Sequence, residues 1–289
     1  MPMPRTAPDV IPHTSFDQYK DKYASHFLLD RTETGVLTAK WHTNGGSLVW
    51  DNPIHRAIHQ LTTDVGQDVE TEVLILGGAG PNWIAQIQPN VEENDENRSW
   101  LSYEHMYYDG TNICEGLVND LEIPTIGVIN GPGFHTEMAL FCDITLIAED
   151  AFICDPHTMA GMVPGDGIQI AMRMAMGYKR ATYAMLTCEM IDAKKALEYG
   201  MVNEVLPKDK IYERALEIAE TLAKQNRITR RLTTQVLRWP MKMAVTEELR
   251  NAFSCEMHAY LATKGSHSPD HEDIKGMLEH TGFDKLSNK

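Results

Sequence analysis

The sequence predicts an α/β fold that is followed by a helical C-terminal region. Short apolar runs rich in β-branched residues recur up to about residue 206 and end in turn-forming residues. Segments with helical spacing of apolar residues separate these runs, and from Lys208 onward the pattern is almost wholly helical. We therefore expect three parts: an N-terminal arm over 1–25, a core over 26–206 and a helical region over 207–289.

The N-terminal third begins with a proline-rich, polar segment over 1–15, which predicts a loose arm. A weak helical pattern over 16–27 follows, and two β-type runs around a Glu-Thr-Gly turn predict a hairpin over 27–43. A helix is expected next, because Asp51 or Asn52 suits its N-cap and Pro53 its first position.

The middle of the chain contains the first hydrophobic core strand, over 72–78, where an apolar run ends in glycines. Residues 90–100 are acidic and predict a solvated loop or flap. Residues 103–121 have helical spacing, with Gly110 and Gly116 as weak points.

Residues 124–170 form the stretch around which the chain is organised. Four turn-forming clusters divide it into two short β-rich runs, a short apolar helix and the start of another helix. The breaks carry polar residues able to do chemistry, notably His135, His157 and Asp166. The later pattern predicts helices over 167–177, 179–190 and 192–199, a strand over 202–206, and helices over 210–225 and 231–264, with Pro240 as a kink or break.

Composition limits the classes of function. A net charge of −15 argues against binding to nucleic acid or to anionic membrane surfaces, because both would be repelled. The five cysteines are scattered and odd in number, which favours free thiols in a reducing compartment. The N-terminus lacks a basic-then-apolar signal pattern, and no apolar run approaches the ~20 residues that span a bilayer. We expect a cytosolic protein.

The order of four segments carries a family resemblance. These segments are IPTIGVINGP, CDITLIAEDAFICDPH, GMVPGDGIQIAMRMAMG and DAKKALEYGMVNEVLP. Together with the helices between them they resemble the crotonase (enoyl-CoA hydratase/isomerase) superfamily over residues 30–210. The resemblance implies a ββα spiral core whose helical C-terminal region packs on the core or on a neighbouring subunit, as a homotrimer or a dimer of trimers.

Departures from the family pattern indicate a branch. The glycine triplet that usually follows the NGP turn is replaced by residues 133–136, Gly-Phe-His-Thr, and His157 stands where hydratases carry a glutamate. The glycine-rich turn after the first core strand ends in 84–87, Ile-Ala-Gln-Ile, in place of small residues, which weakens the standard thioester oxyanion hole. Histidines with an aspartate in PGDG resemble the branch that contains 6-oxocamphor hydrolase and related β-diketone hydrolases.

His157 and Asp166 form the first candidate pair. A carboxylate bonded to one imidazole nitrogen would fix the tautomer and let the other nitrogen take a proton from water. Spacing alone allows another interpretation, in which Asp166 caps the following helix and His157 is a surface histidine. The resemblance favours the dyad, since both positions match that of the branch.

His135 is the candidate oxyanion donor, because backbone donors and the positive dipole end gather at a helix start. Its alternative role is a half-buried residue of the helix start. Glu137 competes with it, since it falls where hydratases keep a catalytic glutamate. We favour His135. Glu256, on a late helix, resembles an acidic residue that the branch brings into the pocket, although a solvated helix face would also explain it.

Trp50 and His55 are five residues apart, like a pair that lines the diketone pocket in the branch. The indole N–H can only donate, which suits polarisation of a ketone, but a core tryptophan is the other reading. Trp83 could wall the pocket or be structural. His55 and His59 share a helix face, and a zinc site would need a third ligand that the spacing does not supply.

The sequence thus predicts a hydrolase that cleaves a carbon–carbon bond of a cyclic or bicyclic β-diketone by a retro-Claisen reaction. His157 would activate water, and His135 and Trp50 would polarise a carbonyl or hold the enolate. His157 or Glu256 would protonate the enolate, giving a keto acid without metal or organic cofactor. The alternatives are a CoA-thioester hydratase, isomerase or hydrolase, and a catalytically silent scaffold.

Overall fold

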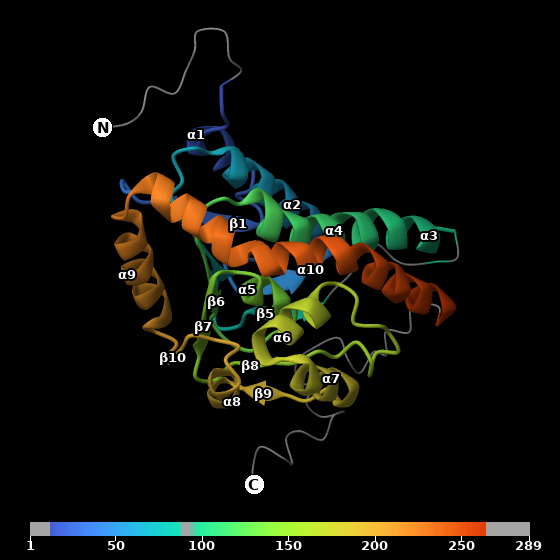
Figure 1. Ribbon diagram of the computed structural model, residues 1–289. Helices are drawn as coiled ribbons and strands as arrows, with labels where there is room; N and C mark the ends of the chain where they lie inside the picture. The colour runs from blue at the N-terminus through green and yellow to red at the C-terminus, as the bar shows by residue number, and fades with distance from the viewer. Residues whose placement is uncertain (1–11, 88–93, 95, 264–289) are drawn as a thin grey trace.

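A mixed six-stranded sheet forms the centre of the computed structural model, which describes residues 12–87, 94 and 96–263 (Figure 1). The strand order is β1-β2-β4-β6-β7-β10; β1 and β2 are antiparallel and the other pairs are parallel. The expected α/β fold with a helical C-terminal region is confirmed. The strands are β1 (Phe27–Arg31), β2 (Val36–Trp41), β4 (Val73–Gly78), β6 (Thr125–Ile129), β7 (Ile144–Ala148) and β10 (Glu204–Leu206).

The predicted hairpin is present as β1 and β2, paired from Phe27 with Trp41 to Arg31 with Leu37. Gly35 in its turn has φ +86°, and a Cβ there would lie 2.5 Å from the carbonyl oxygen of Glu70. The turn therefore needs glycine both for its left-handed backbone and for the close approach.

Two small sheets flank the main one. β3 (Leu48–Trp50) pairs in parallel with β5 (Ile84–Ile87), and β8 (Phe152–Ile153) pairs antiparallel with β9 (Ile191–Asp192). The segment that replaces the family's small residues is therefore a strand, and its partner strand ends at Trp50. This departure in sequence helps to position a candidate site residue.

Helices cover the sheet, and α10 runs beside α4 and α6 across the front of the view in Figure 1. α2 begins as expected, with the Asp51 side chain accepting a hydrogen bond from the Ile54 amide at 3.1 Å. The helices are α1 (Phe16–Tyr19), α2 (Asn52–Gln67), α3 (Arg98–Leu101), α4 (Asp109–Glu115), α5 (Glu137–Leu140), α6 (Ile168–Met176), α7 (Tyr178–Thr187), α8 (Ala193–Glu198), α9 (Ile211–Ala223) and α10 (Arg227–Ala262).

The helix expected over 103–121 starts earlier, at Arg98, and includes the two π-helical segments η1 (Ser102–Tyr108) and η2 (Gly116–Asp120). A Cβ at Gly110 would lie 2.5 Å from the Phe253 ring, and one at Gly116 would meet Thr62. These glycines thus allow close packing against α10 and α2. Residues 90–93 and 95 of the predicted acidic loop lie outside the described residues, and its last three residues belong to α3 instead of a loop.

Two C-terminal details correct the sequence interpretation. α10 continues through Pro240, so this proline does not break the helix, and the helix begins at Arg227 rather than at residue 231.

Within the described part of the chain, no helix combines the length and the apolar character needed to cross a membrane.

The segment before β1 packs on the body of the protein. Tyr19 and Tyr23 are buried, and their hydroxyls donate to Asp68 (3.0 Å) and Asp64 (2.6 Å). The loose arm predicted over 1–15 falls mainly on residues that the structure does not describe. The division into arm, core and helical region stays a prediction.

Candidate active site

Four segments distant in sequence bring the candidate residues together. His135 follows β6, His157 follows β8, Asp166 precedes α6, and Glu256 lies on the last third of α10. The ring nitrogens of the two histidines and the carboxylate oxygens of Asp166 and Glu256 lie within a few ångströms of one another. Because all four side chains are largely withdrawn from solvent, their charges interact strongly.

Asp155 is the residue that orients His157. Its Oδ1 accepts hydrogen bonds from His157 Nδ1 at 2.6 Å and from the His157 backbone amide at 3.1 Å. The predicted partner, Asp166, instead faces the other ring nitrogen, with its Oδ2 3.7 Å from Nε2. Sequence reasoning missed Asp155, although its place two residues before a histidine in Asp-Pro-His was a usable signal.

Asp166 combines the two roles between which the sequence left a choice. Its Oδ1 accepts from the Ile168 amide at 3.2 Å, at the start of α6. Its Oδ2 lies 3.3 Å from His135 Nδ1 and 3.7 Å from His157 Nε2. This Oδ2 is buried and has no hydrogen-bond partner among the described residues. One carboxylate oxygen therefore sits between two histidines without being committed to either.

His135 and Glu137 are neighbours in the cluster rather than alternatives. His135 Nδ1 lies 3.0 Å from Glu137 Oε1, and φ of +53° at His135 turns its ring back onto this segment. The ring stacks on Trp50, with centroids 4.4 Å apart and planes 25° apart. α5 has only four residues, so the expected help from a helix dipole is small, and Trp50 and the carboxylates hold the imidazole instead.

Trp50 does not offer a free indole donor in this structure. Its Nε1 donates to His55 Nε2 at 3.0 Å. Burial lowers the pKa of His55 to about 3, assisted by the nearby charge of His135. His55 is therefore neutral, with Nε2 as the acceptor. The predicted Trp50–His55 pair is formed, but the two side chains are hydrogen-bonded to each other, so the indole N–H is not free for a substrate carbonyl.

Trp83 is fully buried and packs edge-on against Trp41, with ring centroids 4.3 Å apart. Its Nε1 donates to the carbonyl oxygen of His135 at 3.3 Å. Trp83 thus supports the backbone of a site residue. This contact favours the structural role expected for Trp83 over the role of lining the pocket.

The two cluster histidines hold their protons strongly. Burial alone would lower the pKa of His135, but Glu137 and Asp166 outweigh it and raise the pKa to about 10. The same balance, with Asp166, Asp155 and Glu256 as the opposing charges, holds the pKa of His157 well above its ordinary value.

The carboxyl groups of the cluster divide into two kinds. Burial raises the pKa of Glu256 to about 7, although His157 pulls it down. Burial would also raise the pKa of Asp166, but His157 and His135 lower it to about 2. Asp166 is therefore a permanent anion at neutral pH, whereas Glu256 can take and release a proton there.

Glu256 is only 3% exposed, so it is not the solvated helix-face residue that was its alternative. Its Oε2 accepts from the Gly165 amide at 3.2 Å, and its Oε1 lies 3.6 Å from His157 Nε2. α10 therefore closes one side of the cluster and adds a group that titrates near neutrality.

Two overlapping groups in the described ranges could hold a metal ion: His135 with Glu137 and Asp166, and His157 with Asp166 and Glu256. The ligand atoms in each group lie within 4.8 Å of one another. His55 and His59 belong to neither group, so the zinc site considered for that pair gains no third ligand from the described residues.

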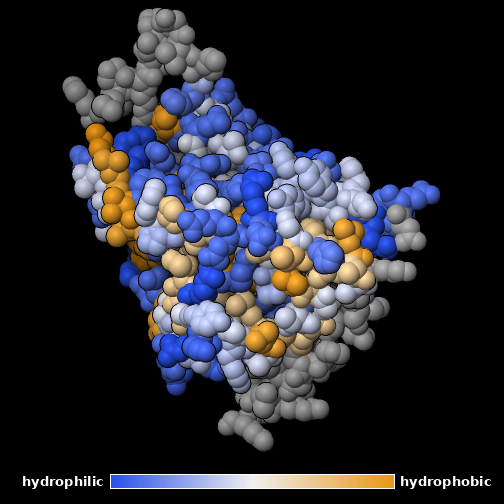
Figure 2. Space-filling view, turned by 45° about the vertical axis from the view of Figure 1, so that its right-hand side comes forward, coloured by the Kyte–Doolittle hydropathy of each residue, from blue (hydrophilic) through white to orange (hydrophobic). Residues whose placement is uncertain are grey.

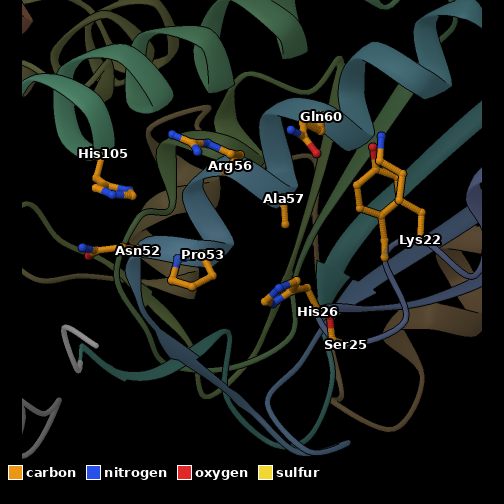
Figure 3. Close-up of a pocket in the computed structure, with 10 residues that line it drawn as sticks. Lys22, Ser25, His26, Asn52, Pro53, Arg56, Ala57, Gln60 and His105 are labelled. Carbon is orange, nitrogen blue, oxygen red and sulfur yellow. The ribbon is translucent and has the colours of Figure 1, made fainter. Parts of the chain in front are cut away.

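A separate pocket of about 400 Å³ lies along another face of α2 (Figure 3). Its cations are already paired: Lys22 Nζ lies 2.9 Å from Asp64, and Arg56 Nη2 lies 3.2 Å from Asp109. None of the lining residues is a site residue predicted from the sequence, and none of the cluster residues lines the pocket. Its lining includes Tyr23, Ser25, His26, Asn52, Pro53, Gln60 and His105.

Among solved structures, the chain is similar to ABDH, a beta-diketone hydrolase from the cyanobacterium Anabaena sp. PCC 7120 bound to (S)-3-oxocyclohexyl acetic acid. The two are 35% identical with a TM-score of 0.80, over 86% of this chain and 98% of that chain. An enoyl-CoA hydratase/isomerase from Mycobacterium paratuberculosis, 22% identical, has the same fold, with a TM-score of 0.72 over 84% of this chain and 96% of that chain.

Curated relatives match over shorter stretches. Hydroxycinnamoyl-CoA hydratase-lyase from Pseudomonas fluorescens is 27% identical over 62% of this chain and 66% of its own length. The 2,3-dehydroadipyl-CoA hydratase of Escherichia coli is 31% identical over 42% of this chain and 49% of its own length. The matched part of the chain thus spans about half to two thirds of the length of these relatives.

The family sequence model described as enoyl-CoA hydratase/isomerase matches residues 61–281. This range contains the three loop residues of the cluster as well as Glu256 on α10. Together with the parallel sheet and the helical C-terminal region, it confirms the resemblance seen in the sequence: the chain belongs to the enoyl-CoA hydratase/isomerase family, the crotonase superfamily of enzymes.

Proposed function

We propose that this chain hydrolyses a carbon–carbon bond of a cyclic or bicyclic β-diketone by a retro-Claisen reaction. The observation that carries the proposal is the convergence of two partly buried histidines, His135 and His157, on the single carboxylate of Asp166, beside the titratable Glu256. The similarity to ABDH supports it, since that protein is a diketone hydrolase with a keto acid bound.

Water activation falls to His157, whose Nδ1 is held by Asp155 and whose Nε2 faces the cluster. His157 acts as a base only in the form in which its Nε2 proton has moved away. Glu256, with Oε1 3.6 Å from Nε2 and a pKa of about 7, is the acceptor for that proton. His157 and Glu256 thus share one proton. When the substrate excludes water, the state with neutral His157 and protonated Glu256 is favoured, because neither group is then charged.

His135 would stabilise the charge that develops on oxygen. Its Nδ1–H is directed to the carboxylates of Glu137 and Asp166, so the protonated ring keeps Nε2–H as a charged donor. Trp50, stacked on this ring, fixes its plane. A donor positioned before the reaction stabilises an oxyanion or enolate more than water does, because it needs no reorganisation.

Water adds to one carbonyl carbon, and one of its protons goes to His157. The bond between that carbon and the central carbon breaks, and the electron pair stays on the central carbon as an enolate conjugated with the second carbonyl. The proton then returns from His157 or Glu256 to this carbon. The products are one ketone and one carboxylic acid, which releases the second proton of the water to solvent as it becomes a carboxylate; in a ring they form a single keto acid.

A second candidate, a CoA-thioester hydratase, is favoured by one observation. Glu137 lies where family hydratases keep a glutamate, and burial raises its pKa, as in a carboxyl poised for proton transfer. The curated relatives act on CoA thioesters by their names. Against this reading, Glu137 is already engaged by His135 at 3.0 Å.

We also propose that the chain assembles as a homotrimer or a dimer of trimers. The face in Figure 2 is mainly hydrophilic with separate hydrophobic patches. Exposed apolar side chains recur at helical spacing along α10, a pattern that suits a contact between subunits. These residues are Ile228, Leu232, Val236, Trp239 and Met243.

The test is mass spectrometry of purified protein incubated in H₂¹⁸O with a panel of cyclic and bicyclic 1,3-diketones, and separately with enoyl-CoA substrates. We expect ring-opened keto acids with one ¹⁸O in the new carboxylate, absent with His157→Gln and retained with the control His258→Gln, an exposed histidine of the same helix as Glu256. Hydration of an enoyl-CoA with no diketone opening would replace this proposal by the thioester reading.

A further inference from the structure

His157, Asp166 and Glu256 have the spacing of metal ligands rather than of hydrogen-bond partners. Nε2 of His157 lies 3.7 Å from Asp166 Oδ2 and 3.6 Å from Glu256 Oε1, and all three atoms lie within 4.8 Å of one another. A tetrahedral Zn²⁺ with bonds of about 2.0–2.2 Å separates its ligand atoms by about 3.4 Å. The described contacts therefore leave space for one ion between the three atoms.

A buried carboxylate oxygen that makes no hydrogen bond points to the same place. Asp166 Oδ2 is buried, yet it has no hydrogen-bond partner among the described residues, while Oδ1 of the same group is bonded to the Ile168 amide. Its charge is met by ion pairs with His135 Nδ1 at 3.3 Å and His157 Nε2 at 3.7 Å, and a metal ion that displaces the proton from His157 Nε2 would bond to it directly.

The surroundings of His157 complete the pattern of a metal-binding histidine. Such histidines usually donate their other ring N–H to a carboxylate, which fixes the ring orientation and raises ligand basicity. Asp155 does this for His157, with 2.6 Å between Oδ1 and Nδ1. The alternative group, His135 with Glu137 and Asp166, suits a metal less well, because His135 Nδ1 and Glu137 Oε1 are already 3.0 Å apart.

We propose that His157 Nε2, Asp166 Oδ2 and Glu256 Oε1 form a binding site for one divalent transition-metal ion of the zinc type. One nitrogen and two carboxylate oxygens match Zn²⁺ or Co²⁺, and a water would complete a tetrahedron. The ion occupies the lone pair that His157 uses to activate water, so metal binding inhibits diketone hydrolysis. That regulatory consequence rests on the proposed function, whereas the site itself does not.

Titration with Co²⁺ of the metal-free full-length protein tests the site without substrate. We expect one equivalent of Co²⁺ to give the visible absorption of a tetrahedral ion, and Zn²⁺ to displace it. His157→Gln and Glu256→Gln should abolish the band, and Asp155→Asn should weaken Co²⁺ binding about 10–100-fold. His258→Gln should leave it unchanged, and circular dichroism checks that each variant is folded.

Absence of the band in the wild-type protein, or its survival in both His157→Gln and Glu256→Gln, would overturn the site. Zn²⁺ should inhibit diketone hydrolysis in proportion to occupancy, with recovery upon chelation. If Co²⁺ binds through these residues but hydrolysis continues at full occupancy, the site stands and His157 is not the base. If no diketone is hydrolysed, the Co²⁺ titration still decides the metal site.

Discussion

Two buried charged clusters in this protein look alike in composition but differ in how completely their groups are bonded. Arg238 donates to both carboxylate oxygens of Asp143 and to the backbone carbonyls of Leu121 and Ile123. Asp143 also accepts from the amide and the hydroxyl of Thr125, at 2.8 and 3.0 Å. In this first cluster each charge is bonded from several sides, which ties α10 to the strands below it.

The His157 cluster contains more charge and fewer bonds. Asp166 Oδ2 has no hydrogen-bond partner in the described chain, and its contacts with both histidines are between 3.3 and 3.7 Å. Protons can therefore move among these groups, and a substrate or ion can enter. The contrast teaches that a fully bonded buried ion pair fixes a fold, whereas an incompletely bonded one is available for chemistry.

The largest effect on stability is expected from breaking the first cluster. Arg238→Ala leaves the Asp143 carboxylate and two backbone carbonyls without their donor, so the free energy of unfolding should fall by about 3–5 kcal/mol. Urea denaturation followed by circular dichroism measures this loss. Arg173→Ala provides the comparison variant, because the Arg173–Glu248 pair is partly open to solvent and should contribute about 0–1 kcal/mol. Equal losses in the two variants would contradict the comparison.

Asp155→Asn tests the second cluster through a positioning residue. An asparagine amide can donate to Nδ1 of His157 and so favour the tautomer with the proton on Nε2, which cannot activate water. We expect kcat to fall about 10²-fold or more with KM little changed. Long-range ¹H–¹⁵N spectra of the imidazole report the tautomer directly. A parallel loss of stability with an unchanged tautomer would assign Asp155 a merely structural role.

Much of the fold and most of the site could be predicted from the sequence. The order of short apolar runs and helical segments predicted the α/β fold, and Asp51 and Gly35 predicted a helix start and a hairpin turn that the structure contains. The turn-forming breaks after two β-rich runs pointed to His135 and His157, which in the structure follow β6 of the main sheet and β8 of the small antiparallel pair.

The partners within the site could not be predicted, because they depend on backbone geometry over two or three residues. The loop after β8 folds so that Asp155 reaches Nδ1 of His157, and the positive φ of His135 brings its ring to Glu137. The Trp50 indole could be read as a substrate donor only until its neighbour His55 was seen to accept from it. Sequence spacing predicts which residues lie close together, but not which of their atoms form hydrogen bonds.

The pH dependence of kcat/KM should separate the two clusters further. Below the Glu256 pKa of about 7, both Glu256 and His157 carry protons, so the base is blocked and the rate should fall about tenfold per pH unit. Above the His135 pKa of about 10, the charged donor is lost and the rate should fall again. Glu256→Gln should lower the rate at pH 7 and move the acidic limb upward toward the pKa of His157, because that proton has lost its acceptor, whereas Arg173→Ala should leave the profile unchanged. A wild-type profile that is flat from pH 5 to 8 would contradict the shared proton.

The smallest effect is expected from Trp50→Phe, which separates the two contacts of this side chain. Phenylalanine keeps an aromatic face for His135 but removes the N–H that donates to His55 at 3.0 Å. Because the donor serves His55 rather than the reacting atoms, kcat should fall only a few-fold, about 1 kcal/mol or less. Trp50→Leu, which also removes the stack on His135, should cost more. Steady-state kinetics of both variants measure these effects. A loss of 10²-fold or more in the kcat of Trp50→Phe would mean that the indole donates to the substrate carbonyl during the reaction and that the site rearranges around it.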